Sequence, residues 1–147
     1  MALRRIKLSL HRGHALELTR VSVGKAKLVY VLITDKKIKY SNGKKSRIAY
    51  IGTTEKGNAR IAQSVAARAE DIFDIRGVHS FHARIITCRP RRNVKTWRQL
   101  ERALLIKFKE MFGEVPYCNI QGKNISRFKE FNYFAEAGVQ ATIEELS

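Results

Sequence analysis

Apolar and polar residues alternate in two short stretches near the N-terminus, residues 6–10 and 16–21, with a polar segment containing Gly13 between them. Alternation with a period of two is typical of a strand with one buried face. The two stretches therefore predict a β-hairpin within residues 1–24. The next apolar stretch, residues 28–33, is continuous and rich in strand-forming residues, which predicts a buried central strand.

A second hairpin is indicated by the dipeptide Asn42-Gly43, because both residues tolerate the positive φ angles of a tight turn. Residues 35–40 extend the central strand toward this turn. Residues 47–51 follow the turn and predict the returning strand, which ends at Gly52.

Two longer segments have apolar residues at helical spacing. The first covers residues 59–73. The second covers residues 96–112 and is followed by Gly113, a residue that often ends a helix. Between them, residues 81–88 have the composition of another strand, and a basic loop leads from this strand into the second helix.

The C-terminal part is expected to begin with an extended stretch at 114–120 and to continue in a last helix from Ser126 to Gly138. Hairpins mixed with helices are typical of the α+β class, with a small, mostly antiparallel sheet flanked by helices. We expect one compact domain in three parts: an N-terminal β-hairpin extension at 1–24, a core at 25–122, and a C-terminal helix and tail at 123–147.

The charge of the chain indicates its partners more clearly than its length does. The 147 residues include 29 Lys and Arg but only 13 Asp and Glu, a net charge of +16. The like charges of such a basic domain repel one another unless a polyanion is near. Nucleic acid is therefore the leading candidate partner, and an anionic membrane is the second. The longest apolar run is too short for a membrane span, and no signal peptide is evident. Two cysteines form no framework, which favours a cytoplasmic location.

Glu101 is the first candidate for chemistry, because it lies on the apolar stripe of the predicted helix with Trp97, Leu104 and Phe108. A carboxylate in such a place must be paired, protonated or bound to a metal ion. An ion pair, with Arg98 or with an arginine of another element, and a metal-binding role are both open at this point.

Two tyrosines and one arginine are the next candidates. Tyr30 lies in the predicted central strand and Tyr50 in the returning strand, where packing is the ordinary role of a tyrosine. Arg60 lies in the first turn of a predicted helix. An arginine there is usually solvated, but together with free helix N–H groups it can bind phosphate.

In combination, these residues resemble the GIY-YIG nuclease family. The resemblance covers about residues 27–119. It is carried, in the order of the family's motifs, by Val29-Tyr30-Val31, Tyr50-Ile51-Gly52, Arg60, Leu100-Glu101 and the stretch that ends at Asn119. Ser64 stands where the family often has Tyr or His, one helical turn after the arginine.

The resemblance implies a metal-dependent DNA endonuclease that hydrolyses phosphodiester bonds with one Mg²⁺ or Mn²⁺ ion. It implies that Glu101 ligates the metal, that Tyr30 or Tyr50 helps to activate the attacking water, and that Arg60 binds the scissile phosphate. Asn119 would hold the geometry of the site. Double-stranded or branched DNA is expected as the substrate in preference to RNA, without a membrane partner, and a homo-oligomer is left open.

Basic side chains on neighbouring surfaces are expected to bind the DNA backbone. They are Lys44, Lys45, Arg47, Arg68, Arg89, Arg91, Arg92 and Lys95. The alternative function is a non-catalytic nucleic-acid-binding module on the same fold, which Ser64 favours. A third interpretation is a basic RNA-binding or ribosome-associated protein in which Glu101 is only a buried partner of an arginine.

Overall fold

The computed structural model describes residues 5–13, 26–119 and 125–147. These residues form an α+β fold with one sheet, as the sequence predicts. In chain order the elements are β1 (Leu28–Lys39), β2 (Lys45–Thr54), α1 (Asn58–Phe73), β3 (Phe81–Ile86), α2 (Thr96–Phe112), the 3-10 helix η1 (Glu130–Asn132) and α3 (Glu136–Leu146).

The sheet is antiparallel, with the strand order β2-β1-β3. β1 is central, and its first six residues are all buried. Each buried aliphatic side chain of this kind contributes roughly 1.5–3 kcal/mol. The predicted turn joins β1 to β2: Gly43 has a φ of 86°, and its N–H donates to the carbonyl of Tyr40 at 2.9 Å. The second hairpin is therefore confirmed.

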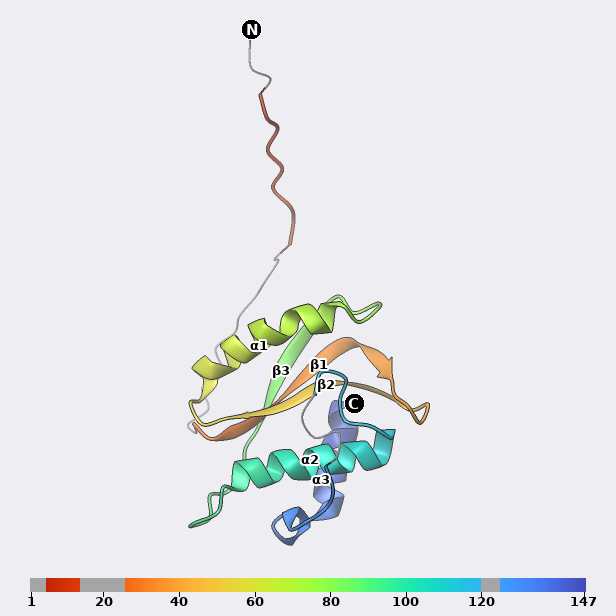
Figure 1. Ribbon diagram of the computed structural model, residues 1–147. Coiled ribbons are helices and arrows are strands. Elements are labelled where there is room, and N and C mark those ends of the chain that lie inside the picture. Colours follow the sequence, from red (N-terminus) through yellow and green to blue (C-terminus); the bar gives the residue numbers. More distant parts are fainter. Residues whose placement is uncertain (1–4, 14–25, 120–124) are drawn as a thin grey trace.

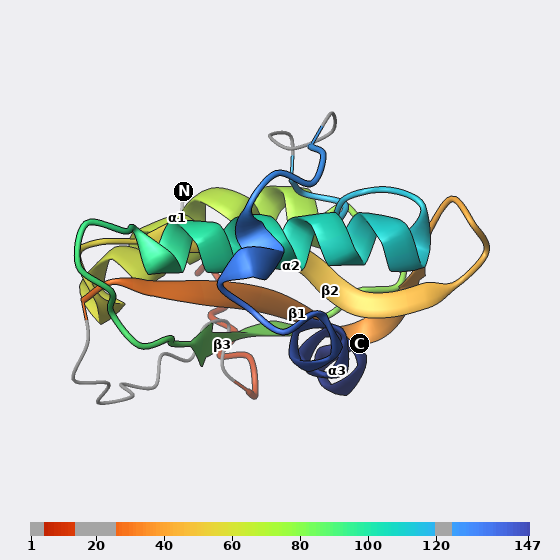
Figure 2. The same cartoon turned by 90° about the horizontal axis from the view of Figure 1, so that it is seen from below.

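The helices form layers on the two faces of the sheet. α1 lies on one face, and α2 and α3 lie on the other (Figure 1). Viewed from below, α2 runs in front of β2 (Figure 2). The α2 side of the core includes Phe108, which is fully buried and meets the ring of Tyr40 edge-on at a centroid distance of 5.0 Å.

The end of α2 is joined to the β1–β2 turn. Gly113 adopts the left-handed conformation at the C-cap, and its N–H donates to the carbonyl of Lys109 at 2.8 Å. The side chain of Asn42 donates to the carbonyl of Met111 at 2.8 Å, so the turn satisfies a carbonyl that the helix leaves free. The predicted helix over 96–112 and its end at Gly113 are confirmed.

The N-terminal hairpin is not borne out where the structure describes it. Residues 5–13 form no strand, and the side chain of Ile6 is 91% exposed. The second stretch of the predicted hairpin, residues 16–21, lies outside the described residues. Alternation indicates which side of a strand would be buried, but a strand forms only where another strand satisfies its backbone groups. The described N-terminal segment leads away from the body of the protein (Figure 1).

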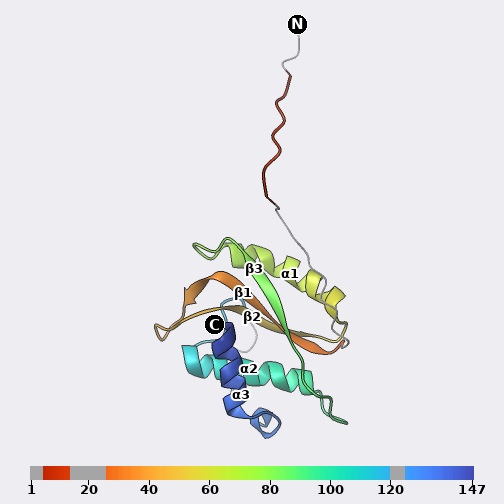
Figure 3. The same ribbon diagram turned by 180° about the vertical axis from the view of Figure 1, so that it is seen from behind.

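The last helix was predicted in the wrong place. Gly138 lies inside α3 rather than at its end, and Phe128 of the predicted helix is 82% exposed. The buried stripe is Val139, Ile143 and Leu146, at intervals of four and three residues. These three residues are the buried ones of α3, which lies beside α2 and contacts β2 (Figure 3). This apolar stripe outweighs the low helix propensity of one glycine.

The stretch after α2 is not a strand either. Tyr117 and Cys118 form a turn, and the described residues 114–119 have no strand pairing. The segment still lies along the outer edge of β2, because the N–H of Cys118 donates to the carbonyl of Ala49 at 2.9 Å. One such bond positions the segment without creating a fourth strand.

Candidate functional site

Two tyrosines meet above a glycine on one face of the sheet. Tyr30 of β1 lies opposite Gly52 of β2, and Tyr50 lies two residues before that glycine. The two rings are tilted by 41° at a centroid distance of 5.9 Å. A Cβ atom on Gly52 would lie 2.6 Å from Cε1 of Tyr50 and 2.8 Å from the hydroxyl of Tyr30. Only glycine leaves room for both rings, which explains the residue type at this position.

Burial raises the pKa of Tyr30 to about 12, although a hydrogen bond with Ser64 of α1 acts in the opposite direction. Tyr30 therefore keeps its proton at neutral pH and takes part in hydrogen bonds as a neutral hydroxyl. Ser64, the residue that departs from the family pattern, is thus a direct partner of a predicted catalytic residue.

Arg68, one helical turn after Ser64, covers Tyr50. Its guanidinium carbon lies 4.5 Å from the ring centroid, a cation–π contact. Its Nη2 lies 3.5 Å from the hydroxyl of Tyr50, and its Nη1 lies 3.5 Å from the carbonyl oxygen of Cys118. The sequence assigned Arg68 only to the DNA-binding surface, although its spacing from Arg60 and Ser64 along one side of a helix was a signal for a place in the site.

Glu101 approaches β2 from α2. Its carboxyl is mostly buried and shares a hydrogen bond with the side chain of Thr53. Burial raises its pKa, while Thr53 and the charges of Arg98 and Arg102 lower it by less. Because side chains alternate along a strand, Thr53 and Gly52 face opposite sides of the sheet. Glu101 and the tyrosine pair therefore meet β2 at adjacent residues but from different faces.

The arginines beside Glu101 have other partners. Arg98 pairs with Glu55 at 3.1 Å, and Arg102 pairs with the buried Glu130 at 2.7 Å. Within the described part of the chain, neither forms its ion pair with Glu101. A structural ion pair with Arg98, one of the two roles left open by the sequence, is therefore not formed.

Asn119 is buried and attached to the same strand. Its side chain accepts a hydrogen bond from the N–H of Ile51 at 3.0 Å and donates one to the carbonyl of Ile51 at 2.8 Å. In this way the segment after α2 holds the backbone of β2 between Tyr50 and Gly52.

Most residues of the predicted site thus belong to, or contact, four consecutive residues of β2. Residue 50 is itself a predicted catalytic residue, residue 51 binds Asn119, residue 52 lies under Tyr30, and residue 53 binds Glu101. Two elements, β1 and α2, and the loop after α2 thus meet about 10–14 Å of one strand.

Arg60 is not brought into contact with this group. It is exposed, and its Nη1 donates to the side chain of Gln63 at 2.5 Å. Arg60, Ser64 and Arg68 follow one another along one side of α1, but the tyrosines lie beside the second and third of them. The tyrosines are thus contacted from the later turns of α1, whereas Arg60 lies in its first turn and is exposed.

The predicted DNA-binding residues form two exposed groups at opposite ends of the strands, apart from Arg68. One group lies at the β1–β2 turn and the other in the loop before α2 (Figure 2). They are Lys44, Lys45 and Arg47 in the turn group and Arg89, Arg91, Arg92 and Lys95 in the loop group. Arg91 also lies over the ring of Tyr133 at 5.5 Å.

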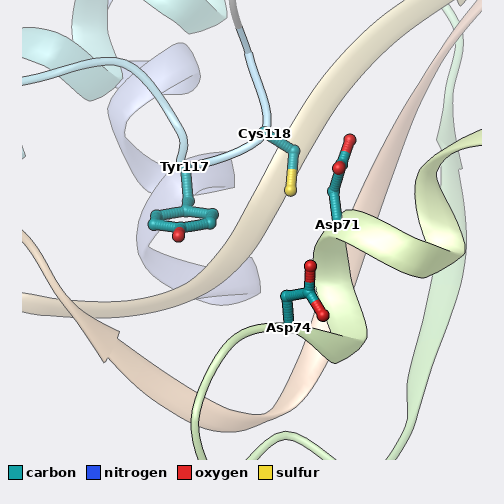
Figure 4. Close-up of a pocket in the computed structure, with 4 residues that line it drawn as sticks. All are labelled: Asp71, Asp74, Tyr117 and Cys118. Atoms are coloured by element: carbon teal, nitrogen blue, oxygen red, sulfur yellow. The ribbon is translucent and has the colours of Figure 1, made fainter.

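A shallow pocket of about 280 Å³ lies next to the site and is lined by Asp71, Asp74, Tyr117 and Cys118 (Figure 4). Its carboxylates disfavour an anion such as phosphate. Burial raises the pKa of Cys118 to about 11, so this thiol is neutral and a poor nucleophile. Across residues 5–13, 26–119 and 125–147, no group of three or more His, Cys, Asp or Glu is arranged to hold a metal ion.

No protein-family model, curated protein or solved structure matches the chain. None of the helices described here combines the length and the apolar character needed to cross a bilayer.

Proposed function

We propose that this protein is a metal-dependent DNA endonuclease that hydrolyses phosphodiester bonds at a GIY-YIG-type site. The observation that supports the proposal is that Tyr30, Tyr50, Glu101 and Asn119 all contact or belong to residues 50–53 of β2, with the tyrosines on one face of the sheet and Glu101 on the other. Packing alone accounts for the tyrosines. It does not account for the mostly buried carboxyl of Glu101, which contacts Thr53 from α2 and has no ion-pair partner among the described residues.

The donor set fits a hard divalent cation. Mg²⁺ and Mn²⁺ prefer oxygen ligands and keep several waters, so one protein carboxylate is a sufficient anchor. Glu101 would hold the ion, and its burial disfavours a bare negative charge that a cation would offset. When bound, the ion would stabilise the negative charge that develops on the phosphate and the leaving oxygen.

The other residues position the reacting groups. Tyr50 is the less buried of the two residues, and its hydroxyl would orient the attacking water, while the protonated Tyr30 beside it would act as a hydrogen-bond partner. Asn119 fixes the backbone between them. The two basic groups would hold the DNA along its phosphates.

The experiment is plasmid nicking by the full chain with Mg²⁺ or Mn²⁺, compared with Glu101→Gln and with EDTA. We expect Glu101→Gln to abolish cleavage and to leave DNA binding unchanged. Glu145→Gln, which makes the same change at an exposed position of α3, is the matched control and should cut like the wild type. Equal loss of cleavage and binding in Glu101→Gln would contradict the assignment.

A second function, a non-catalytic nucleic-acid-binding module on the same fold, is favoured by one observation. Ser64 stands where the family often has Tyr or His, and its partner Tyr30 keeps its proton. Salt-sensitive binding without cleavage of plasmid, branched DNA or single-stranded DNA would select this function over the first.

A further inference from the structure

Arg68 is a half-buried cation without a carboxylate partner among the described residues. Two of its N–H groups point to neutral oxygens, the hydroxyl of Tyr50 and the carbonyl of Cys118, both at 3.5 Å. Bonds of this length are weak. A guanidinium has five N–H donors, so three of those of Arg68 have no acceptor within the described part of the chain.

Two neighbours define where this guanidinium lies. Its central carbon lies over the ring of Tyr50, 4.5 Å from the centroid, a contact that leaves N–H groups at the rim of the guanidinium able to form other bonds. The acceptor at Cys118 is itself fixed, because the N–H of Cys118 donates to Ala49 and the next residue, Asn119, is tied to Ile51. A flat, charged fork placed between an aromatic ring and a fixed backbone segment is suited to bind a phosphate through two oxygens.

We infer that Arg68, rather than Arg60, is the arginine that binds the scissile phosphate. The inference rests on the proposed function, and it names a substrate-binding residue that the family pattern does not assign. Phosphate would replace the weak bonds of Arg68 with charge-assisted ones beside the hydroxyl of Tyr50. The contact would place the phosphorus next to the tyrosine pair and outside the pocket of Asp71 and Asp74, whose carboxylates disfavour phosphate. Arg60 contacts neither tyrosine.

The contacts of Arg68 also predict which interactions a substitution would remove. Lysine keeps the charge but has neither the flat surface that stacks on Tyr50 nor the fork that binds two oxygens. Arg68→Lys should therefore fail to restore what Arg68→Ala loses. If the only role of Arg68 were to add positive charge, lysine would restore most of it.

The experiment compares Arg68→Ala, Arg68→Lys and Arg60→Ala in the full chain, with thermal unfolding as the check on folding. We expect the two Arg68 variants to cut plasmid DNA at least 10-fold more slowly than the wild type and Arg60→Ala within about 3-fold of it. We expect the log–log dependence of duplex affinity on salt, measured in EDTA, to become shallower by about 1 in Arg68→Ala. It should not change in Arg60→Ala.

The affinity measurement separates this inference from the proposed function. If the wild type does not cut but Arg68→Ala and Arg68→Lys still weaken duplex binding and Arg60→Ala does not, the nuclease proposal fails and the phosphate contact stands. A larger loss in Arg60→Ala than in Arg68→Ala overturns the inference. So does full rescue by Arg68→Lys. If Arg68→Ala does not fold, the comparison of Arg68→Lys with Arg60→Ala is sufficient to test the inference.

Discussion

The side chain of Asn119 makes both of its amide hydrogen bonds to one residue, Ile51. The two bonds use the backbone N–H and carbonyl that β2, as an edge strand, presents on its outer side. The side chain thus pairs with backbone groups that a neighbouring strand would otherwise bind. Because Ile51 lies between Tyr50 and Gly52, the same contact closes the sheet edge and positions the candidate site.

Asn119→Ala should destabilise the fold by about 2 kcal/mol, because an unpaired buried backbone group costs roughly 1–3 kcal/mol. The free energy of unfolding in urea measures this. Asn132→Ala removes the same side chain from an exposed position and should change stability by less than about 0.5 kcal/mol. Equal stabilities for the two variants would show that the Ile51 backbone finds other partners.

Gly52→Ala should loosen the tyrosine pair. The added methyl would lie within 2.8 Å of both rings, so at least one ring must move. Overpacking of this kind costs about 1–3 kcal/mol. We expect a loss of stability in urea and changed ring signals of Tyr30 and Tyr50 in NMR spectra.

Gly138→Ala is the matched control, because the same methyl at that position meets no atom within 4 Å. Alanine is the better helix former, so this variant should be about 0.5–1 kcal/mol more stable than the wild type. A neutral effect of Gly52→Ala, with the expected gain at Gly138, would mean that the rings adapt without cost.

The sheet and the main helices could be predicted because local patterns decide them. Asn42-Gly43 sets the hairpin that brings Tyr30 next to Gly52, and the apolar stripe of α2 turns Glu101 inward. Asn119 could be named only through the family resemblance, since its partner is a backbone and leaves no signal in side-chain spacing.

Other features depend on packing that no local pattern contains. Residues 6–10 alternate like a strand but have no partner strand in the described chain. Arg60 and Arg68 lie on the same side of α1, and their positions along the helix relative to the tyrosine pair decide which one reaches Tyr50. Glu130 is almost fully buried against Arg102, yet its sequence context looks like an exposed turn.

Acid should weaken the attachment of α3. Hydrogen bonds from Arg127 and then Lys107 lower the pKa of Glu136 to about 2, below its ordinary value of 4.5. Because the folded-state pKa is the lower one, this carboxylate stabilises the fold above about pH 4.5. The contribution is lost as the pH falls toward 2. Glu136→Gln should therefore be less stable than the wild type at pH 7, and the difference should shrink as the pH falls from 5 to 2.

Urea unfolding at several pH values measures this convergence. Glu145→Gln, at an exposed position of the same helix, is the control and should follow the wild type across the range. A constant difference between wild type and Glu136→Gln from pH 7 to pH 2 would show that the loss comes from packing and not from the ionised carboxylate.

DNA should contact both basic groups at once if it runs along the strands. The groups lie at opposite ends of the sheet, and the 12 residues of β1 span about 40 Å, roughly the length of 12 base pairs. The log–log salt dependence of binding should become shallower by up to about 2 in Lys44→Ala/Lys45→Ala and in Arg89→Ala/Arg92→Ala, because each lost phosphate contact removes about 0.9.

Duplex length and charge position provide the controls for this prediction. Lys36→Ala/Lys37→Ala removes the same net charge from exposed positions of β1 outside both groups and should leave the salt dependence unchanged. With a duplex of about 6 base pairs, too short to reach both ends, the effects of the two double variants should no longer add. Equal effects of all three double variants at every duplex length would instead indicate that DNA responds only to the overall charge of +16.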